Sequence, residues 1–96
     1  VEIIDLRTLK PLDFDLITDS VKKTNNVLIV HEACLTGGFG GEIAARIGET
    51  LFDDLDAPVT RIGAKDVPIP FSPLMENFVL PQVTNIVDGV KKVLNR

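Results

Sequence analysis

Apolar residues along the chain change from a continuous run to a helical period, and this change marks the first expected elements. Four consecutive apolar residues at 27–30, three of them β-branched, are typical of a strand buried on both faces, as in a parallel sheet. Four glycines follow within 37–41. From inside this loop onward, apolar residues recur every fourth position, the spacing of one helix face: Phe39, Ile43, Ile47 and Leu51. The stretch therefore predicts a strand, a glycine loop and a helix.

The remaining pattern completes an alternating order of strands and helices. Besides the strand at 27–30 and the helix from the glycine loop to about Leu55, we expect strands over 1–6 and 59–62, a helix from its cap Asp13 to about Thr24, and a helix from about Gln82. The expected inner faces consist of Leu16, Ile17 and Val21 in the first helix and of Val83, Ile86, Val87, Val90, Val93 and Leu94 in the last. Residues 63–81 hold four prolines and are expected to be mostly irregular. This order predicts an α/β fold with a parallel sheet and right-handed crossovers.

Length, charge and cysteine content exclude several classes of protein. With 96 residues the chain is one small domain. A net charge of −4 and a pI near 4.8 argue against nucleic acid as a partner, and no run reaches the roughly 18 apolar residues of a membrane span. One cysteine excludes an internal disulfide and fits a reducing compartment. Because the chain starts at Val1 inside an expected strand, we expect a piece of a longer polypeptide.

The glycine loop has the shape of a phosphate site without its full pattern. Counted from Gly38, the dinucleotide fingerprint places Ile43 where Gly or Ala is needed for close helix packing. No Gly-Lys-Ser/Thr sequence completes a P-loop, and Glu42 in the first helical turn would repel a phosphate. We expect the glycines to allow close packing against another backbone and to cap the helix, with a bound anion as the alternative.

Two further groups of side chains carry alternative interpretations. His31 and Glu32 suggest a metal or acid–base site, but His31 is the only histidine and no ligand spacing completes it; a structural or interface role is favoured. The thiol of Cys34 precedes a helix N-terminus, which can lower a thiol pKa, yet no base is placed beside it by the sequence, which favours a packed, unreactive thiol.

An acidic cluster and a proline-rich segment are candidate contact surfaces. Asp53, Asp54 and Asp56 lie at a helix C-terminus, where the helix dipole disfavours negative charge. They form either an ordinary solvated surface or a docking site for a basic partner. The apolar, proline-rich segment 67–73 is long for a small domain, and we expect a partner subunit to cover it.

Several blocks of sequence occur in one order and carry a family resemblance. They are Ile4-Asp5-Leu6-Arg7-Thr8-Leu9-Lys10-Pro11-Leu12-Asp13, His31-Glu32-Ala33, Thr36-Gly37-Gly38-Phe39-Gly40-Gly41-Glu42-Ile43, Leu55-Asp56-Ala57-Pro58-Val59 and Lys65-Asp66-Val67-Pro68-Ile69-Pro70-Phe71. Together they span essentially the whole chain. The sequence resembles the C-terminal domain of the beta subunit of a thiamine-diphosphate-dependent 2-oxo acid dehydrogenase, of the branched-chain, pyruvate or acetoin type.

This resemblance implies a particular fold. It is a transketolase C-terminal-like domain, a three-layer α/β/α sandwich on a mostly parallel sheet. The family's domain begins with an earlier strand and helix, and that strand lies between the equivalents of 1–6 and 27–30. We therefore expect residues 1–96 to form a single, partial, N-terminally truncated domain that presents open strand edges.

The resemblance also implies a function within a larger enzyme. The whole enzyme decarboxylates a 2-oxo acid (2-oxoisovalerate or pyruvate) or cleaves acetoin, and it transfers the acyl group to lipoamide. Its thiamine diphosphate and Mg lie elsewhere, so no catalytic, cofactor-binding or metal residue is carried over to this chain. Expected partners are the alpha subunit and a second beta subunit, in a heterotetramer, and the subunit-binding domain of the acyltransferase core. The expected location is the bacterial cytoplasm or the mitochondrial matrix.

Two sets of residues are therefore candidate contact sites. Docking of the acyltransferase's basic domain is assigned to Asp54, Asp56 and Arg96, and a subunit interface to His31, Glu32, Gly37, Gly38, Phe39, Gly40 and Gly41. A stand-alone, Rossmann-like module that binds a nucleotide or an anion through Gly37–Gly41 is the alternative function.

Overall fold

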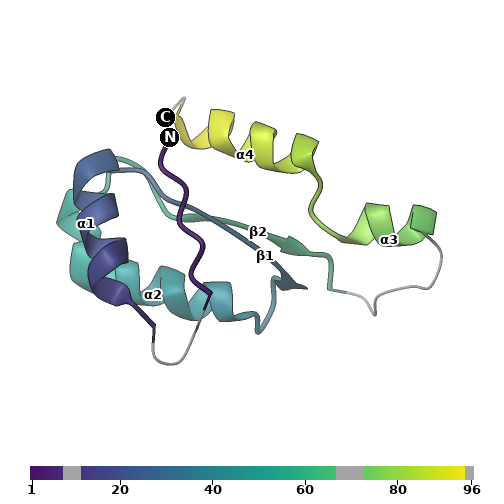
Figure 1. The fold of residues 1–96 in the computed structure, drawn as a ribbon, viewed down its shortest axis with the longest axis horizontal. Helices are drawn as coiled ribbons and strands as arrows, with labels where there is room; N and C mark the ends of the chain where they lie inside the picture. The colour runs from purple at the N-terminus through teal and green to yellow at the C-terminus, as the bar shows by residue number, and fades with distance from the viewer. Residues whose placement is uncertain (8–11, 67–72, 95–96) are drawn as a thin grey trace.

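The computed structural model describes residues 1–7, 12–66 and 73–94. Helices and strands alternate through most of this described part (Figure 1). In chain order they are α1 (Phe14–Thr24), β1 (Leu28–Cys34), α2 (Phe39–Leu51), the short 3-10 helix η1 (Phe52–Asp54), β2 (Thr60–Ala64), α3 (Pro73–Val79) and α4 (Val83–Leu94).

The described elements form three layers around a parallel pair of strands. β1 and β2 pair in parallel, with Leu28 opposite Thr60. Figure 1 shows α2 on one side of the strands and α4 on the other, and both helices contact both strands. Consecutive side chains of β1 divide between the two helices, because Leu28 packs near Gly89 of α4 and Ile29 near Gly40 of α2. The expected α/β/α arrangement with a parallel sheet is confirmed.

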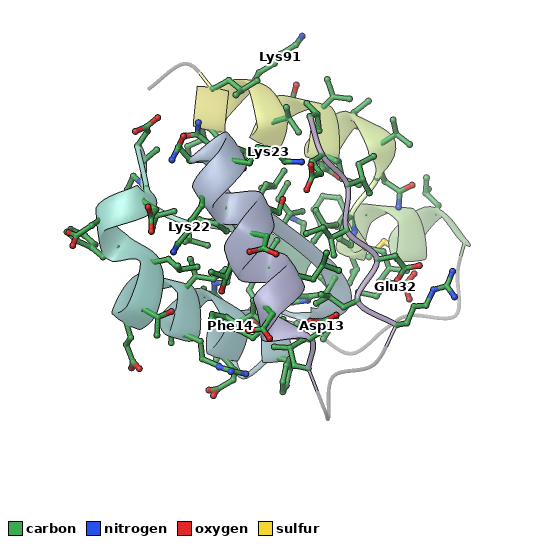
Figure 2. The ribbon with its side chains drawn as sticks, turned by 60° about the vertical axis from the view of Figure 1, so that its left-hand side comes forward. Asp13, Phe14, Lys22, Lys23, Glu32 and Lys91 are labelled. Atoms are coloured by element: carbon green, nitrogen blue, oxygen red, sulfur yellow. The ribbon has the colours of Figure 1, made fainter. Side chains whose placement is uncertain are left out.

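Local chemistry explains where α1 and α3 begin. The Asp13 carboxylate accepts a hydrogen bond from the Leu16 amide at 3.2 Å and caps α1 as expected. Asn25 ends this helix in the left-handed conformation, with φ of 64°. Figure 2 shows Asp13 and Phe14 at the start of α1 and the Lys22 and Lys23 side chains near its other end. The expectation of a mostly irregular 63–81 is wrong over α3, which starts at Pro73, because proline suits a first helical position, where no amide donor is needed.

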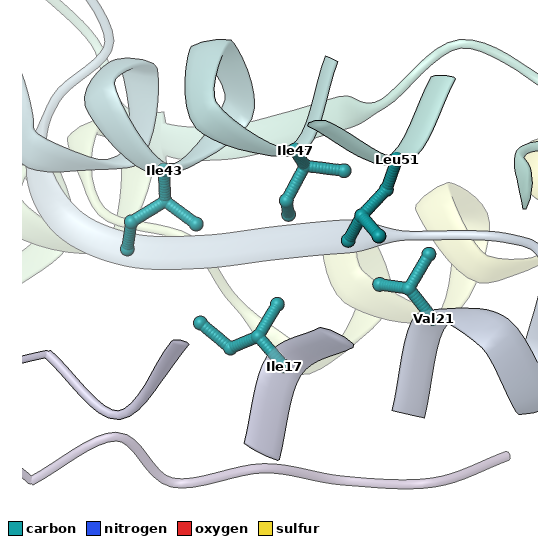
Figure 3. Close-up of a cluster of buried hydrophobic side chains, with 5 residues drawn as sticks. All are labelled: Ile17, Val21, Ile43, Ile47 and Leu51. Carbon is teal, nitrogen blue, oxygen red and sulfur yellow. The ribbon is translucent and has the colours of Figure 1, made fainter. Parts of the chain in front are cut away.

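The core lies between α1 and α2. Five buried side chains meet there, as Figure 3 shows: Ile17, Val21, Ile43, Ile47 and Leu51. All five core residues were expected from the helical periods. Two members of the expected faces are not buried, however, because Leu16 is 47% exposed and Phe39 is 39% exposed.

The expected strand over 1–6 is wrong. Residues 1–7 adopt no regular structure, and no backbone hydrogen bond joins them to the rest of the described chain. An ion pair of 2.6 Å joins Glu2 to Lys23 of α1. A groove of about 500 Å³, lined by Ile4, Leu6 and Ile29 among others, separates this segment from β1. A strand needs a partner backbone about 4.8 Å away. Because the groove lies between residues 1–7 and β1, the two backbones form no hydrogen bonds with each other.

Two expectations about burial are corrected by this small sheet. The strand at 27–30 is not buried on both faces, since Val30 is 41% exposed. The single apolar stripe expected on α4 divides into two sides. Val93 is buried beneath the helix, whereas three other members of the stripe are exposed: Val83, Val87 and Leu94. An apolar period identifies a face that can be buried, but a neighbouring element must be present to bury it.

The ends of the two strands are tied together by side chains. Thr36, just after β1, donates to the Asp66 carboxylate from its amide at 3.1 Å and from its hydroxyl at 2.6 Å. The Arg61 guanidinium donates to the Leu35 carbonyl at 2.9 Å. The hydrogen bonds from the Thr36 hydroxyl and amide hold the pKa of the Asp66 carboxyl below its ordinary value. This tie fixes the start of the glycine loop against the end of β2.

We expect the isolated 96-residue polypeptide to be only marginally stable. Two paired strands seldom make a stable sheet, and several large apolar side chains of α3 and α4 stay in water. Scanning calorimetry of the purified polypeptide should give a weak transition below about 45 °C, the lower end of the range for small domains. A sharp, cooperative transition in the ordinary range would contradict this expectation.

The Thr36–Asp66 tie predicts a pH-dependent contribution to stability. Because the folded-state pKa of Asp66 is lowered, its contribution is fully present above the ordinary carboxyl value of 3.8 and is lost as the pH falls through the folded-state pKa. Asp66→Asn should therefore lower the urea midpoint at pH 7 and 10 °C. The difference from the parent chain should shrink as the pH falls below the ordinary carboxyl range.

Thr36→Val is the matched second variant for this test, since it removes the hydroxyl donor and keeps the carboxylate. It should bring the pKa of Asp66, followed by carbonyl NMR, closer to the ordinary value. An unchanged titration in this variant would refute the assigned cause.

Candidate functional site

The glycine loop joins β1 to α2 through a short turn. Gly37 has φ of 76° and so occupies the left-handed region that favours glycine. Gly38 precedes the first residue of α2 in an extended conformation and offers no side chain to cap the helix. The expected order of strand, loop and helix is therefore confirmed, but the helix has no side-chain cap at its start.

The loop closes over the imidazole of His31. A Cβ atom built at Gly38 would lie 2.9 Å from Cε1 of His31, and one built at Gly63 of β2 would lie 2.6 Å from the same atom. At Gly40, in the first turn of α2, a Cβ would clash with both Cδ2 and Nε2 of the ring. Because real Cβ atoms essentially never approach within 3.0 Å, glycines of three different elements surround one side chain. The close packing expected of this loop is present at Gly38, where a Cβ would clash with the backbone carbonyl oxygen of Cys34, and the histidine of the same chain adds to it.

The hydrogen bond of His31 defines which ring nitrogen carries the proton. Its Nδ1 lies 2.8 Å from the Ala33 carbonyl oxygen, which can only accept, so Nδ1 is the donor. Nε2 is buried and has no hydrogen-bond partner among the described residues. In the neutral ring this atom carries a lone pair and no proton. The imidazole is therefore a packed structural group that is attached to the chain by one hydrogen bond.

The residues around the loop do not fit a diphosphate. The imidazole of His31 fills the space between the glycines, and the Glu42 side chain is exposed in the first turn of α2. Ile43, which occupies the third fingerprint position, is part of the core. Within the described ranges, no three His, Cys, Asp or Glu side chains gather to hold a metal ion. At this loop, the packing of His31 and the charge of Glu42 thus do not suit a diphosphate.

Cys34 takes part in the contact between the strand ends. Its Sγ lies 3.4 Å from the Lys65 carbonyl oxygen, to which the thiol donates, and the residue is half-buried. The sequence favoured a packed, unreactive thiol, and this geometry is consistent with it.

Three of the seven proposed interface residues of the loop region are exposed. Glu32, Gly37 and Phe39 reach the surface, whereas Gly40 is buried and the other three are half-buried: His31, Gly38 and Gly41. Figure 2 shows the Glu32 side chain at the surface. A partner that contacts this region would therefore meet Phe39 and the Gly37 backbone, beside the carboxylate of Glu32.

The acidic cluster of Asp53, Asp54 and Asp56, called the acidic turn from here on, lies at the opposite end of α2 from the glycine loop. Asp53 and Asp56 are exposed and Asp54 is half-buried. The amide side chain of Asn25 donates to the Asp54 carbonyl at 2.7 Å, and the Asp56 amide donates to the Asn25 carbonyl at 2.8 Å. The C-terminal cap of α1 thus fixes the turn. The two candidate sites are separated by the length of α2, about 20 Å, so they are not brought together.

The acidic turn also carries an apolar side chain that the sequence analysis did not single out. Phe52 is 74% exposed, directly before Asp53 and one residue beyond the last buried position of α2. The sequence did contain a signal for this exposure: Phe52 is apolar but lies one residue after Leu51, the last position of the four-residue apolar period. In the described part of the chain the single ion pair is that of Lys23 with Glu2, so the Asp54 and Asp56 carboxylates have no cationic partner there. Arg96 and the proline-rich residues 67–72 lie outside the described residues.

None of the described helices is both long and apolar enough to cross a membrane.

Comparison with known proteins identifies the family. The chain is 49% identical to the pyruvate dehydrogenase E1 component subunit beta of Porphyra purpurea over 94 residues, which are 98% of this chain and 28% of that protein. It is 48% identical to the subunit of the same name in Rickettsia felis over 92 residues, 96% of this chain and 28% of that protein. The mitochondrial subunit of Dictyostelium discoideum is 44% identical over 95 residues, 99% of this chain and 27% of that protein.

The chain thus spans a little over a quarter of the length of these relatives. The family model described as "Transketolase, C-terminal domain" matches residues 1–86. This agrees with the blocks of sequence that carried the resemblance and with the α/β/α layers of the fold. The chain belongs to the transketolase C-terminal domain family.

Proposed function

We propose that the chain is the C-terminal assembly domain of the beta subunit of a thiamine-diphosphate-dependent 2-oxo acid dehydrogenase. The observation that carries the proposal is the identity of 44–49% over almost the whole chain to pyruvate dehydrogenase E1 beta subunits. Those names support pyruvate as the substrate of the whole enzyme, ahead of 2-oxoisovalerate or acetoin. The complete enzyme would decarboxylate the 2-oxo acid and transfer the acyl group to lipoamide.

The domain itself would have no catalytic role. Thiamine diphosphate, held with Mg by other parts of the enzyme, supplies the carbanion chemistry. The charge at the helix start supports this division, because the exposed carboxylate of Glu42 in the first turn of α2 would repel a phosphate. The proposed partners are an alpha subunit and a second beta subunit in a heterotetramer. The bacterial cytoplasm or the mitochondrial matrix is the proposed location.

We further propose that the acidic turn docks the basic subunit-binding domain of the acyltransferase core. Asp54 and Asp56 have no cationic partner among the described residues, and the exposed ring of Phe52 beside them offers apolar contact area. The hydrogen bonds with Asn25 hold the backbone of the turn in place, which limits the ordering that binding would require. Carboxylates in this position would steer and pair with Arg or Lys side chains. Arg96, assigned to the same surface by resemblance, remains part of this proposal.

Reversing the two carboxylates tests the docking proposal. Asp54→Lys with Asp56→Lys, in the complete beta subunit assembled with its alpha partner, should weaken binding of the acyltransferase's subunit-binding domain about tenfold or more at low salt. The loss should shrink as the salt concentration rises, because salt screens the pairing. Surface plasmon resonance over a salt series measures both effects.

The matched control is Asp19→Lys with Asp88→Lys, which makes the same change in net charge at exposed positions of α1 and α4. This variant should bind like the parent subunit. Unchanged binding of the Asp54 and Asp56 variant at low salt would refute the docking proposal.

A direct titration separates the assembly domain from a nucleotide-binding module. ATP, NAD and inorganic diphosphate, added to the labelled chain at 10 °C, should leave the amide NMR signals of residues 36–42 unchanged. The reason is that the loop lacks the full fingerprint, with Ile43 at its third position, and that Glu42 in the first turn of α2 would repel a phosphate. Saturable shifts confined to this loop would favour the alternative function instead.

A further inference from the structure

The glycine at position 40 has no explanation in the helix to which it belongs. Gly40 is the second residue of α2, and a glycine within a helix is less favourable than an alanine. Its φ is not in the left-handed region, so backbone conformation does not require it. The closest atoms to a Cβ built there are Cδ2 and Nε2 of His31, with a methyl of Ile29 next at 3.2 Å. The imidazole is therefore what excludes a side chain at this position.

The other two glycines around the ring are less specific. A Cβ at Gly38 would also clash with the Cys34 carbonyl oxygen, and one at Gly63 would lie 2.8 Å from the Ala33 carbonyl oxygen. Backbone atoms alone would thus keep both positions as glycine. Gly40 is the position that depends on His31, and it places the first turn of α2 directly on the ring.

We propose that His31 is the positioning residue of the glycine loop. Its imidazole acts as a spacer between β1, β2 and the first turn of α2, and it sets where the exposed Gly37 and Phe39 meet the proposed alpha subunit. The role in subunit contact rests on the function proposed above. The positioning itself rests on the contacts of the ring alone.

Each edge of the ring has a distinct part in this arrangement. The Nδ1 hydrogen bond to the Ala33 carbonyl fixes the orientation of the ring. The opposite edge, Cδ2 and Nε2, forms the surface on which Gly40 rests. Nε2 has no hydrogen-bond partner among the described residues, so this edge contributes shape and no polar contact. A side chain that keeps a donor at the Nδ1 position but ends there would preserve the orientation and free the space above Gly40.

Asparagine has this shape. The variants His31→Asn and Gly40→Ala and the double variant therefore form a double-mutant cycle, measured in the complete beta subunit assembled with its proposed alpha partner. Gly40→Ala alone should lower the folding equilibrium constant of the subunit at least about tenfold, since the ring must leave its hydrogen bond to Ala33 and its place against Gly63 to make room for the methyl group. His31→Asn should be milder. In the double variant, the folding equilibrium constant should be at least about fivefold higher than the product of the two single effects predicts.

Gly48→Ala is the matched control for the cycle. It lies in the same helix with nothing within 4 Å of a built Cβ, so it should be neutral or stabilising and should show no coupling to His31→Asn. Additive effects of Gly40→Ala and His31→Asn would overturn the proposal. Coupling of Gly48→Ala as strong as that of Gly40→Ala would overturn it too.

The affinity for the alpha subunit separates positioning from simple stability. At a temperature where every variant is folded, Gly40→Ala should weaken binding of the alpha subunit, and the added His31→Asn should restore part of it. Coupling in stability with unchanged affinity would overturn the positioning of a subunit contact, while leaving the ring as the spacer of the loop. Failure of the unmodified beta subunit to bind an alpha subunit would instead overturn the proposed function.

Discussion

Burial of one face of α2 is the interaction on which the described structure depends. Ile43, Ile47 and Leu51 of this helix meet two residues of α1 in the core, and Ile47 is only 1% exposed. Burying an aliphatic side chain of this size contributes roughly 1.5–3 kcal/mol. The small sheet provides little apolar area besides, so the contact between the two helices is the main source of packing. α2 also lies against both strands, and through it α1 is held to the sheet.

The same helix carries a candidate contact site at each of its ends. At its start, the ring of His31 determines how closely the glycine loop approaches β1 and β2. At its end, Asn25 of α1 fixes the backbone of the acidic turn through two hydrogen bonds. Both surfaces are thus positioned by residues that lie beneath or beside them. Rigid support of this kind is what a surface needs if it is to bind without a large loss of conformational entropy.

The exposed apolar surface fits a domain that works within an assembly. Leu74 and Phe78 on α3 and Val83 on α4 remain largely in water, and Val87 on α4 is 45% exposed. Apolar patches of this kind on a protein surface usually mark places where another chain packs. The open groove beside β1 has the same character, since most of its lining is aliphatic. These apolar surfaces are the part of the described structure that the proposed assembly role would cover.

The sequence by itself determined the family, most of the order of the elements and, through the family resemblance, the layers of the fold. Strand and helix periods, the cap at Asp13 and the blocks of shared sequence are local properties, so no knowledge of contacts was needed. Ile43 and Glu42 likewise argued against a phosphate at the loop before any geometry was known. Local patterns identify which face of an element is apolar and which residue can start a helix.

Only the tertiary structure decided what covers each face. Residues 1–7 have the composition of a strand, but a strand exists only when a second backbone lies within hydrogen-bonding distance, and here a groove intervenes. The stripe on α4 is apolar throughout, yet the sheet reaches just one side of it. The contact of His31 with Gly40 and Gly63 joins residues of three elements, which no local period can reveal. What the glycines accommodate is therefore a property of the folded chain, because it depends on which side chain the fold brings beneath them.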